Sequence, residues 1–211
     1  MAAGLHIAVE GIDGSGVTTH SKLLVERLSS MGYRVVYFKE PTSGPVGKII
    51  RALLKTENPR QELLALLFAA DRVWNYYEAN PSIASVKSSG GIAVSDRYKY
   101  SSLAYQGVAL GYEWVACVNS RVPPADIVVY LDVPVEVAIR RVGERDFKET
   151  FEKREFLEKV KESYEHALLH AEREGTRVIR VSEVRGGLER PIEEVSLEIL
   201  RRVVNAISDI L

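Results

Sequence analysis

The sequence predicts an α/β fold with three layers, in which helices cover both faces of a parallel β-sheet. Short runs rich in β-branched residues alternate with long amphipathic stretches, and this alternation is typical of βαβ units. The chain has 211 residues, of which 46% are hydrophobic, so it can bury the core of one α/β domain. The sequence has no linker or internal repeat, and we therefore expect a single domain over residues 1–211.

Five short runs rich in Val, Ile, Leu or aromatic residues are predicted as the strands of the sheet. Each run lies between stretches with helical periodicity, as expected for strands joined by crossover helices. In chain order they cover residues 5–10, 34–39, 91–95, 126–132 and 177–181.

The amphipathic stretches between these runs are predicted as helices. In chain order they cover residues 18–31, 45–54, 60–78, 81–88, 101–111, 112–119, 135–142, 154–174 and 191–210. Turn residues separate the elements, as helix stops should: Gly32, Gly90-Gly91, Pro123-Pro124, Gly175 and Gly186-Gly187. Residues 140–154 are dense in both signs of charge, so they form either a solvated connection or a cover over a site.

Charge and cysteine content exclude several classes of protein. Lys and Arg number 28 against 29 Asp and Glu, so the net charge of −1 gives no overall field for nucleic acid or an anionic membrane. We expect neither as a partner. The sequence shows no signal peptide and no apolar run long enough for a membrane span, which favours a cytoplasmic location. Cys117 is the single cysteine, which excludes an intramolecular disulfide, and we expect it on a buried helix face.

A glycine-rich run, Glu-Gly-Ile-Asp-Gly-Ser-Gly-Val-Thr-Thr at residues 10–19, follows the first strand and opens a helix. This is the context of a P-loop, whose backbone N–H groups and helix N-terminus hold a phosphate chain. The alternative is a tight turn without a ligand. The expected ATP phosphate site comprises Gly11, Asp13, Gly14, Ser15, Gly16, Val17, Thr18 and Thr19. The hydroxyl of Thr18 is a candidate ligand for Mg²⁺.

Further segments resemble thymidylate kinases over nearly the whole chain. The resemblance rests on residues 10–14, 39–42, 67–72, 95–98, 101–107 and 131–134. It implies the fold of a P-loop nucleoside monophosphate kinase, with a five-stranded sheet of order 2-3-1-4-5 and a lid at about residues 140–154. It also implies transfer of the γ-phosphoryl group of ATP to dTMP with Mg²⁺, usually by a homodimer.

The resemblance also implies an acceptor site for dTMP. Arg97 lies just past the third strand, where its guanidinium can clamp a phosphate, and Asp96 resembles the carboxylate that holds the water shell of magnesium. Phe68 would stack on the base, and Tyr105 would crowd the 2′ position of a ribose. The full set that the resemblance implies is Asp13, Glu40, Phe68, Arg72, Arg97, Ser101, Tyr105, Gln106 and Tyr164.

Most of these residues also have a purely structural interpretation. Arg97 and Arg72 can form surface pairs with their neighbours Asp96 and Asp71, and Phe68 can belong to the core. Likewise, Tyr164 can be structural, Asp13 can serve as a helix N-terminal charge, and Glu40 as a turn residue.

Positioning and charge neutralisation should dominate catalysis, because the acceptor is a phosphate oxygen that needs no general base. The expected catalytic residues are Arg97, Asp13 and two lid arginines, Arg141 and Arg145. Val17 departs from the P-loop pattern, since it stands where a lysine normally reaches the β- and γ-phosphates. The lid arginines are the favoured substitutes for that lysine, and Lys22 is the other candidate. Two alternative functions stay open: a kinase of the same fold with another deoxynucleotide or deoxynucleoside acceptor, and, because of Val17, a nucleotide-binding protein with little turnover.

Overall fold

The computed structural model describes residues 4–56, 59–143 and 147–210, with the backbone alone for residues 147–153. Residues 144–146 of the expected lid lie outside the described residues, and Arg145 is among them.

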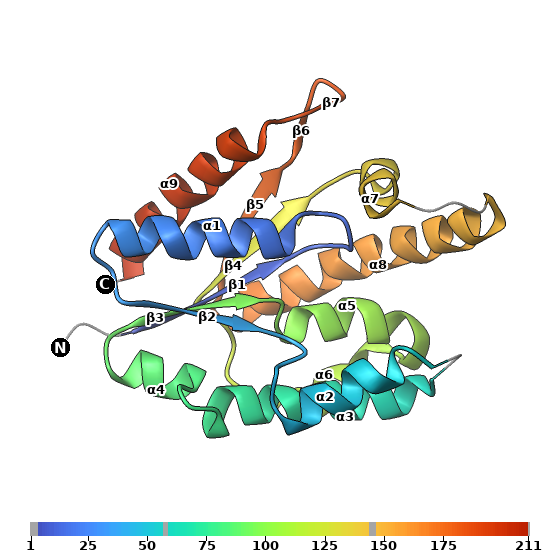
Figure 1. The fold of residues 1–211 in the computed structure, drawn as a ribbon, viewed down its shortest axis with the longest axis horizontal. Helices are drawn as coiled ribbons and strands as arrows, with labels where there is room; N and C mark the ends of the chain where they lie inside the picture. The colour runs from blue at the N-terminus through green and yellow to red at the C-terminus, as the bar shows by residue number, and fades with distance from the viewer. Residues whose placement is uncertain (1–3, 57–58, 144–146, 211) are drawn as a thin grey trace.

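A five-stranded parallel sheet forms the centre of the molecule, with the strand order β2-β3-β1-β4-β5 (Figure 1). The expected order 2-3-1-4-5 is therefore confirmed. The central strand β1 is buried along its whole length, because both faces of the sheet are covered; four of its six residues are apolar. The strands are β1 (Leu5–Glu10), β2 (Val35–Lys39), β3 (Ile92–Asp96), β4 (Ile127–Asp132) and β5 (Arg177–Ser182).

Helices cover both faces of this sheet (Figure 1). The helices α1 (Val17–Ser30) and α9 (Ile192–Ile210) pack on one face, and α4 (Ile83–Ser88), α5 (Lys99–Leu110) and α8 (Phe147–Arg173) pack on the other. The remaining helices are α2 (Pro45–Leu53), α3 (Gln61–Val73), α6 (Tyr112–Val118) and α7 (Val135–Val142). The chain therefore has the predicted three layers.

Three elements differ from the sequence prediction. Helix α8 begins at Phe147, seven residues before the predicted start at residue 154, so it includes part of the expected lid. The helix expected at residues 60–78 is α3 followed by a π-helical turn, η1 (Trp74–Glu78). A short antiparallel hairpin of β6 (Val184–Arg185) and β7 (Leu188–Glu189) was not predicted. Gly186 and Gly187 form its turn with positive φ angles of 59° and 80°, the left-handed backbone that a two-residue hairpin favours.

Cys117 is exposed, so its expected burial is wrong. In α6 only Val115 is fully buried, against the core formed by α5 and α8. Cys117 follows two residues later, about 200° around the helix, and therefore faces away from that core. In the described residues, no helix combines the length and the apolar character needed to cross a membrane.

Candidate functional site

A cavity of about 700 Å³ opens at the carboxyl edge of the sheet, where β1 passes into α1 on the right of Figure 1. Open α/β folds bind ligands at this edge. Most of the predicted residues line it: Asp13, Gly14, Gly16, Val17, Thr18, Thr19, Glu40, Phe68, Arg72, Asp96, Arg97, Ser101, Tyr105 and Gln106. The structure therefore brings the expected donor and acceptor residues to one cavity.

The glycine-rich loop has the backbone of a phosphate-binding turn. Gly14 and Gly16 have positive φ angles of 85° and 75°, which only glycine adopts at little cost. A Cβ on Gly14 would lie 2.3 Å from the carbonyl oxygen of Ala138, so α7 packs directly against the loop. Helix α1 begins at Val17, and its N-terminus therefore faces the loop. Ser15 and Gly11 belong to the loop without lining the cavity, and Ser15 is fully buried.

Val17 occupies the position of the P-loop lysine, and its side chain is only 5% exposed. It belongs to the apolar cluster that α1 and α9 form with one face of the sheet. The residue therefore serves the core and contributes no charge to the loop.

Thr18 and Asp96, the two predicted magnesium ligands, are in contact. The hydroxyl of Thr18 donates to Asp96 Oδ2 at 2.7 Å, and Tyr37 donates to the same oxygen at 2.7 Å. Lys39 Nζ donates to Asp96 Oδ2 at 2.8 Å and to Thr18 Oγ1 at 2.9 Å. Burial acts to raise the pKa of Asp96, but the hydrogen bonds from Lys39, Tyr37 and Thr18 outweigh it and lower that pKa, so the carboxylate is charged.

Lys39 was not predicted as a site residue. The available signal was its place as the last residue of β2, because parallel strands bring their carboxyl ends to one edge of the sheet.

Arg97 lines the cavity and has a φ angle of 71°, which is rare outside glycine. Its guanidinium donates to Asp13 Oδ1 at 2.7 Å and to the carbonyl oxygen of Gly11 at 2.9 Å. A third bond runs to Ser101 Oγ at 3.1 Å. The carboxylate partner is thus Asp13, and the alternative surface pair with Asp96 is wrong because Asp96 pairs with Lys39.

Tyr164 is fully buried behind Arg97 and does not line the cavity. Its hydroxyl lies 3.0 Å from Glu10 Oε2, 3.0 Å from Ser101 Oγ and 3.3 Å from Arg97 Nη1. Burial raises the pKa of Glu10, while hydrogen bonds from Ser101, Tyr98 and Tyr164 act against that rise. Tyr164 therefore holds the residues beneath Arg97 in place.

Arg72 and Glu40 form a buried ion pair at the wall of the cavity. Arg72 Nη2 lies 2.6 Å from Glu40 Oε2, and both side chains are at most 3% exposed. The alternative pair of Arg72 with Asp71 is wrong, because Asp71 accepts hydrogen bonds from the backbone and hydroxyl of Thr42. Burial raises the pKa of Glu40 to about 7, although the charge of Arg72 acts to lower it.

Aromatic side chains from three helices line the cavity. Phe68 of α3 is half-buried and lines the cavity, so it does not belong to the core alone. Tyr105 of α5 accepts a hydrogen bond from the backbone N–H of Asp13 at 2.7 Å. Phe156 of α8, which was not predicted, has its ring 6.2 Å from that of Tyr105. Its spacing of eight residues before Tyr164 places both near one face of α8 and was the available signal.

Arg141 lies beside the loop, where it donates to the carbonyl oxygen of Gly14 at 3.1 Å. Its guanidinium is also paired with Glu183 and with Glu189 of the β6–β7 hairpin. Lys22, the other predicted substitute for the P-loop lysine, is exposed and does not line the cavity.

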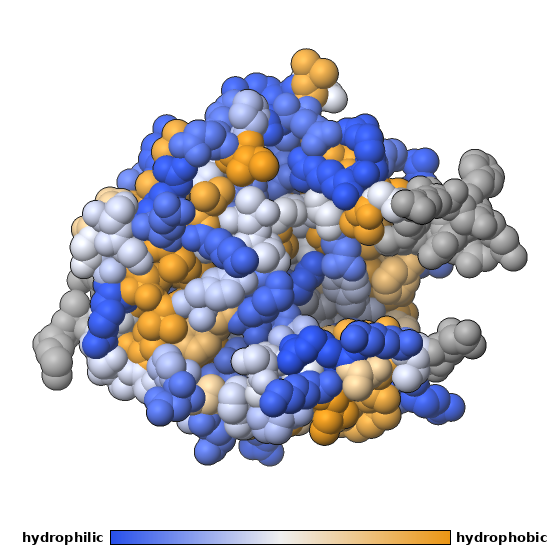
Figure 2. Space-filling model, in the orientation of Figure 1, coloured by the Kyte–Doolittle hydropathy of each residue, from blue (hydrophilic) through white to orange (hydrophobic). Residues whose placement is uncertain are grey.

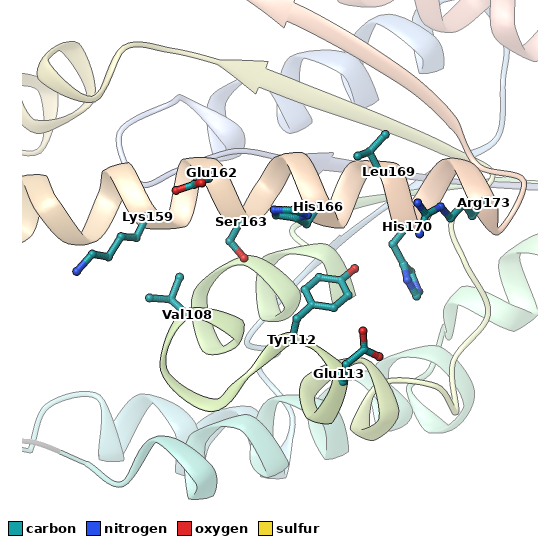
Figure 3. Close-up of a pocket in the computed structure, with 10 residues that line it drawn as sticks. All are labelled: Val108, Tyr112, Glu113, Lys159, Glu162, Ser163, His166, Leu169, His170 and Arg173. Atoms are coloured by element: carbon teal, nitrogen blue, oxygen red, sulfur yellow. The ribbon is translucent and has the colours of Figure 1, made fainter.

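A second cavity, of about 470 Å³, lies between α8 and the pair of helices α5 and α6 (Figure 3). His166 and His170 of α8 line it, together with Tyr112. None of the predicted site residues lines this cavity. Among the described residues, no three His, Cys, Asp or Glu side chains form a group that could hold a metal ion.

The chain is similar to known proteins over most of its length. A family model described as Thymidylate kinase matches residues 9–186. A putative thymidylate kinase of Aeropyrum pernix is 53% identical, over 95% of this chain and 96% of its own. Probable thymidylate kinases of Pyrobaculum aerophilum and Methanococcus aeolicus are 41% and 36% identical, each over 94% of this chain and at least 95% of their own. This chain belongs to the thymidylate kinase family.

Proposed function

We propose that the protein transfers the γ-phosphoryl group of ATP to dTMP and releases ADP and dTDP. The observation that carries the proposal is the junction between the two expected phosphate sites, where Arg97 contacts both Gly11 and Asp13 of the P-loop. A phosphate held by Arg97 would therefore lie next to phosphates held by the loop.

The proposed reaction needs positioning and charge neutralisation more than proton transfer. An oxygen of the dTMP phosphate attacks the γ-phosphorus of ATP, and the bond from that phosphorus to the β–γ bridging oxygen breaks. Because the attacking oxygen is already ionised, no base is required. Arg97 would clamp the acceptor phosphate and reduce its repulsion from ATP, and Asp13 would hold the guanidinium in place.

Mg²⁺ fits the residues at the end of the P-loop. Magnesium in such sites takes one or two carboxylates together with substrate phosphates and water. Thr18 and Asp96 offer a hydroxyl and an ionised carboxylate 2.7 Å apart, which is a suitable set of oxygen donors. When bound, Mg²⁺ would be held by Thr18 and Asp96 and would supply positive charge that neutralises the phosphates of ATP.

The far end of the cavity is proposed to hold the thymine and deoxyribose. Phe68 offers an aromatic face for stacking, and Gln106 offers an amide for hydrogen bonding to the base. Tyr105 reaches across to the backbone of Asp13, which puts its ring beside the acceptor phosphate site and supports its proposed exclusion of a 2′-hydroxyl. Arg72 and Glu40 would shape the wall of this pocket.

A homodimer and a cytoplasmic location complete the proposal. ATP and dTMP are cytoplasmic metabolites, and the family resemblance implies a dimer.

Orange side chains gather over α2 and α3 at the lower edge of Figure 2, and a second copy would cover them. The exposed apolar residues of α2, α3 and η1 are Ile49, Leu63, Leu66, Val73 and Tyr77. Light scattering should give the mass of a dimer for the native chain and of a monomer for Leu66→Glu.

Turnover with a panel of acceptors tests the proposed activity. The purified protein is incubated with ATP, Mg²⁺ and dTMP, dUMP, dCMP or thymidine, and both ADP release and the phosphorylated product are measured. We expect dTDP as product and the highest kcat/KM for dTMP. Preference for another acceptor, or ADP release no faster than without acceptor, would refute the proposal.

A further inference from the structure

The P-loop of this chain lacks the lysine that normally contacts the β- and γ-phosphates. Val17 stands at that position with its side chain in the apolar core. The loop then offers only backbone N–H groups and the N-terminus of α1 to a phosphate chain with several negative charges. A cation from elsewhere in the fold is needed to match that charge.

Three arginines near the loop are already engaged in the part of the chain that the structure describes. Arg72 is buried in its pair with Glu40, and Arg97 is bound to Asp13 and the acceptor side of the cavity. Arg141 is paired with Glu183 and Glu189. Arg72 and Arg141 would have to break their pairs with carboxylates before they could contact a phosphate of ATP. Arg97 is expected to hold the phosphate of the acceptor instead.

Lys39 is also paired with a carboxylate, that of Asp96, but its side chain reaches Thr18, the residue that follows Val17. In the parallel register of β2 and β3, Lys39 lies opposite Asp96, and its Nζ is 2.9 Å from Thr18 Oγ1. The side chain is 49% exposed and lines the cavity. An ammonium group has three N–H donors, and the bonds to Thr18 and Asp96 use two. One N–H remains for a ligand.

We propose that Lys39 is the donor-phosphate cation of this enzyme, and that it contacts the β- and γ-phosphates of ATP in place of the missing P-loop lysine. The inference rests on the proposed function for the identity of the donor nucleotide. Thr18 and Asp96 position the ammonium group. They are also the residues that would hold Mg²⁺, which would supply further positive charge to the phosphates of ATP. The lysine thus comes from the end of β2, whereas the usual lysine comes from the first turn of α1.

Nucleotide affinity tests this proposal without relying on turnover. ATP and dTMP dissociation constants are measured by calorimetry for the native chain, Lys39→Met, Lys39→Gln and Lys39→Arg, with EDTA and again with Mg²⁺. Lys48→Met replaces an exposed lysine of α2 outside the cavity lining and is the matched control. Because Lys39 is half exposed, we expect all variants to keep the far-ultraviolet circular dichroism and melting behaviour of a folded protein.

With EDTA, Lys39→Met and Lys39→Gln should weaken ATP binding by roughly 10- to 100-fold, the usual value of a lost charge-assisted hydrogen bond. Lys39→Arg should keep most of the affinity, Lys48→Met should equal the native chain, and dTMP affinity should change by less than about twofold. ATP affinity within about twofold of native in both neutral variants would overturn the proposal, as would an equal loss for dTMP. If the native chain binds ATP but does not phosphorylate dTMP, the proposed function fails while the role of Lys39 is still decided.

Discussion

The buried pair of Arg72 and Glu40 makes a sharp prediction about stability. Arg72→Met replaces the charged guanidinium side chain with an uncharged, apolar side chain of similar length. Glu40 Oε2 then loses the guanidinium bonds of 2.6 and 2.8 Å, and the carboxylate stays about 3% exposed. Removing one partner of a buried ion pair typically costs about 3–5 kcal/mol, because the remaining charge is buried without compensation.

The size of this loss should depend on pH. Burial raises the pKa of Glu40 to about 7 in the folded protein even beside Arg72, and without Arg72 that pKa rises further. A carboxyl group with a raised folded pKa stabilises the protein below its unfolded pKa and loses that contribution as pH rises through the folded value. At pH 6 the variant therefore holds Glu40 neutral and loses less stability. At pH 8.5, which lies about 1.5 units above the Glu40 pKa of about 7 in the native protein, the loss should exceed that at pH 6 by about 2 kcal/mol.

Urea unfolding at pH 6 and pH 8.5 measures this difference. Adding Glu40→Gln to Arg72→Met should recover much of the loss at pH 8.5, because no buried charge remains. The exposed pair of Arg60 and Glu62 supplies a control, since Arg60→Met should cost less than about 1 kcal/mol. A loss below about 1 kcal/mol for Arg72→Met at pH 8.5, or no recovery in the double variant, would refute this account of the pair.

Three further predictions concern the acceptor site and acid stability. Arg97→Ala should lower kcat/KM for dTMP by about 30- to 1000-fold, equivalent to about 2–4 kcal/mol, with little change in ATP affinity; an unchanged kcat/KM would remove Arg97 from the acceptor site. Tyr105→Ala should relax the preference for deoxyribose over ribose and Tyr105→Phe should keep it, so equal selectivity for dTMP over its ribo analogue in the native and Ala proteins would contradict steric exclusion. Burial, with charge repulsion from nearby lysines, lowers the pKa of His6 to about 3, so the folded state binds fewer protons than the unfolded state below pH 6.5 and stability falls as pH decreases. The free energy of unfolding should fall by about 3 kcal/mol by pH 4, and this contribution should disappear in His6→Asn. The control His166→Asn, at an exposed site, should show the same fall as the native protein.

The elements and the phosphate loop could be predicted from the sequence because their signals are local. Apolar runs between helical stretches identified all five strands of the sheet, and a glycine loop between β1 and α1 identified the candidate phosphate site. The order of the strands has no such local signal, because periodicity does not say which strands are neighbours. The order 2-3-1-4-5 was predicted from the family resemblance. That resemblance also gathered Arg97, Phe68 and Tyr105 into one expected site.

The partners of the charged residues were decided by the tertiary structure alone. Arg72 pairs with Glu40, which is 32 residues away, and not with the adjacent Asp71, because the helix turns neighbouring side chains about 100° apart. Lys39 reaches Thr18 and Asp96 only because β2 lies beside β3 and β3 beside β1. The sequence therefore determined that the glycine-rich loop carries Val17 in place of the P-loop lysine, whereas the order of the strands determined that Lys39 lies against Thr18 and Asp96, because residues on separate strands meet only when the sheet is assembled.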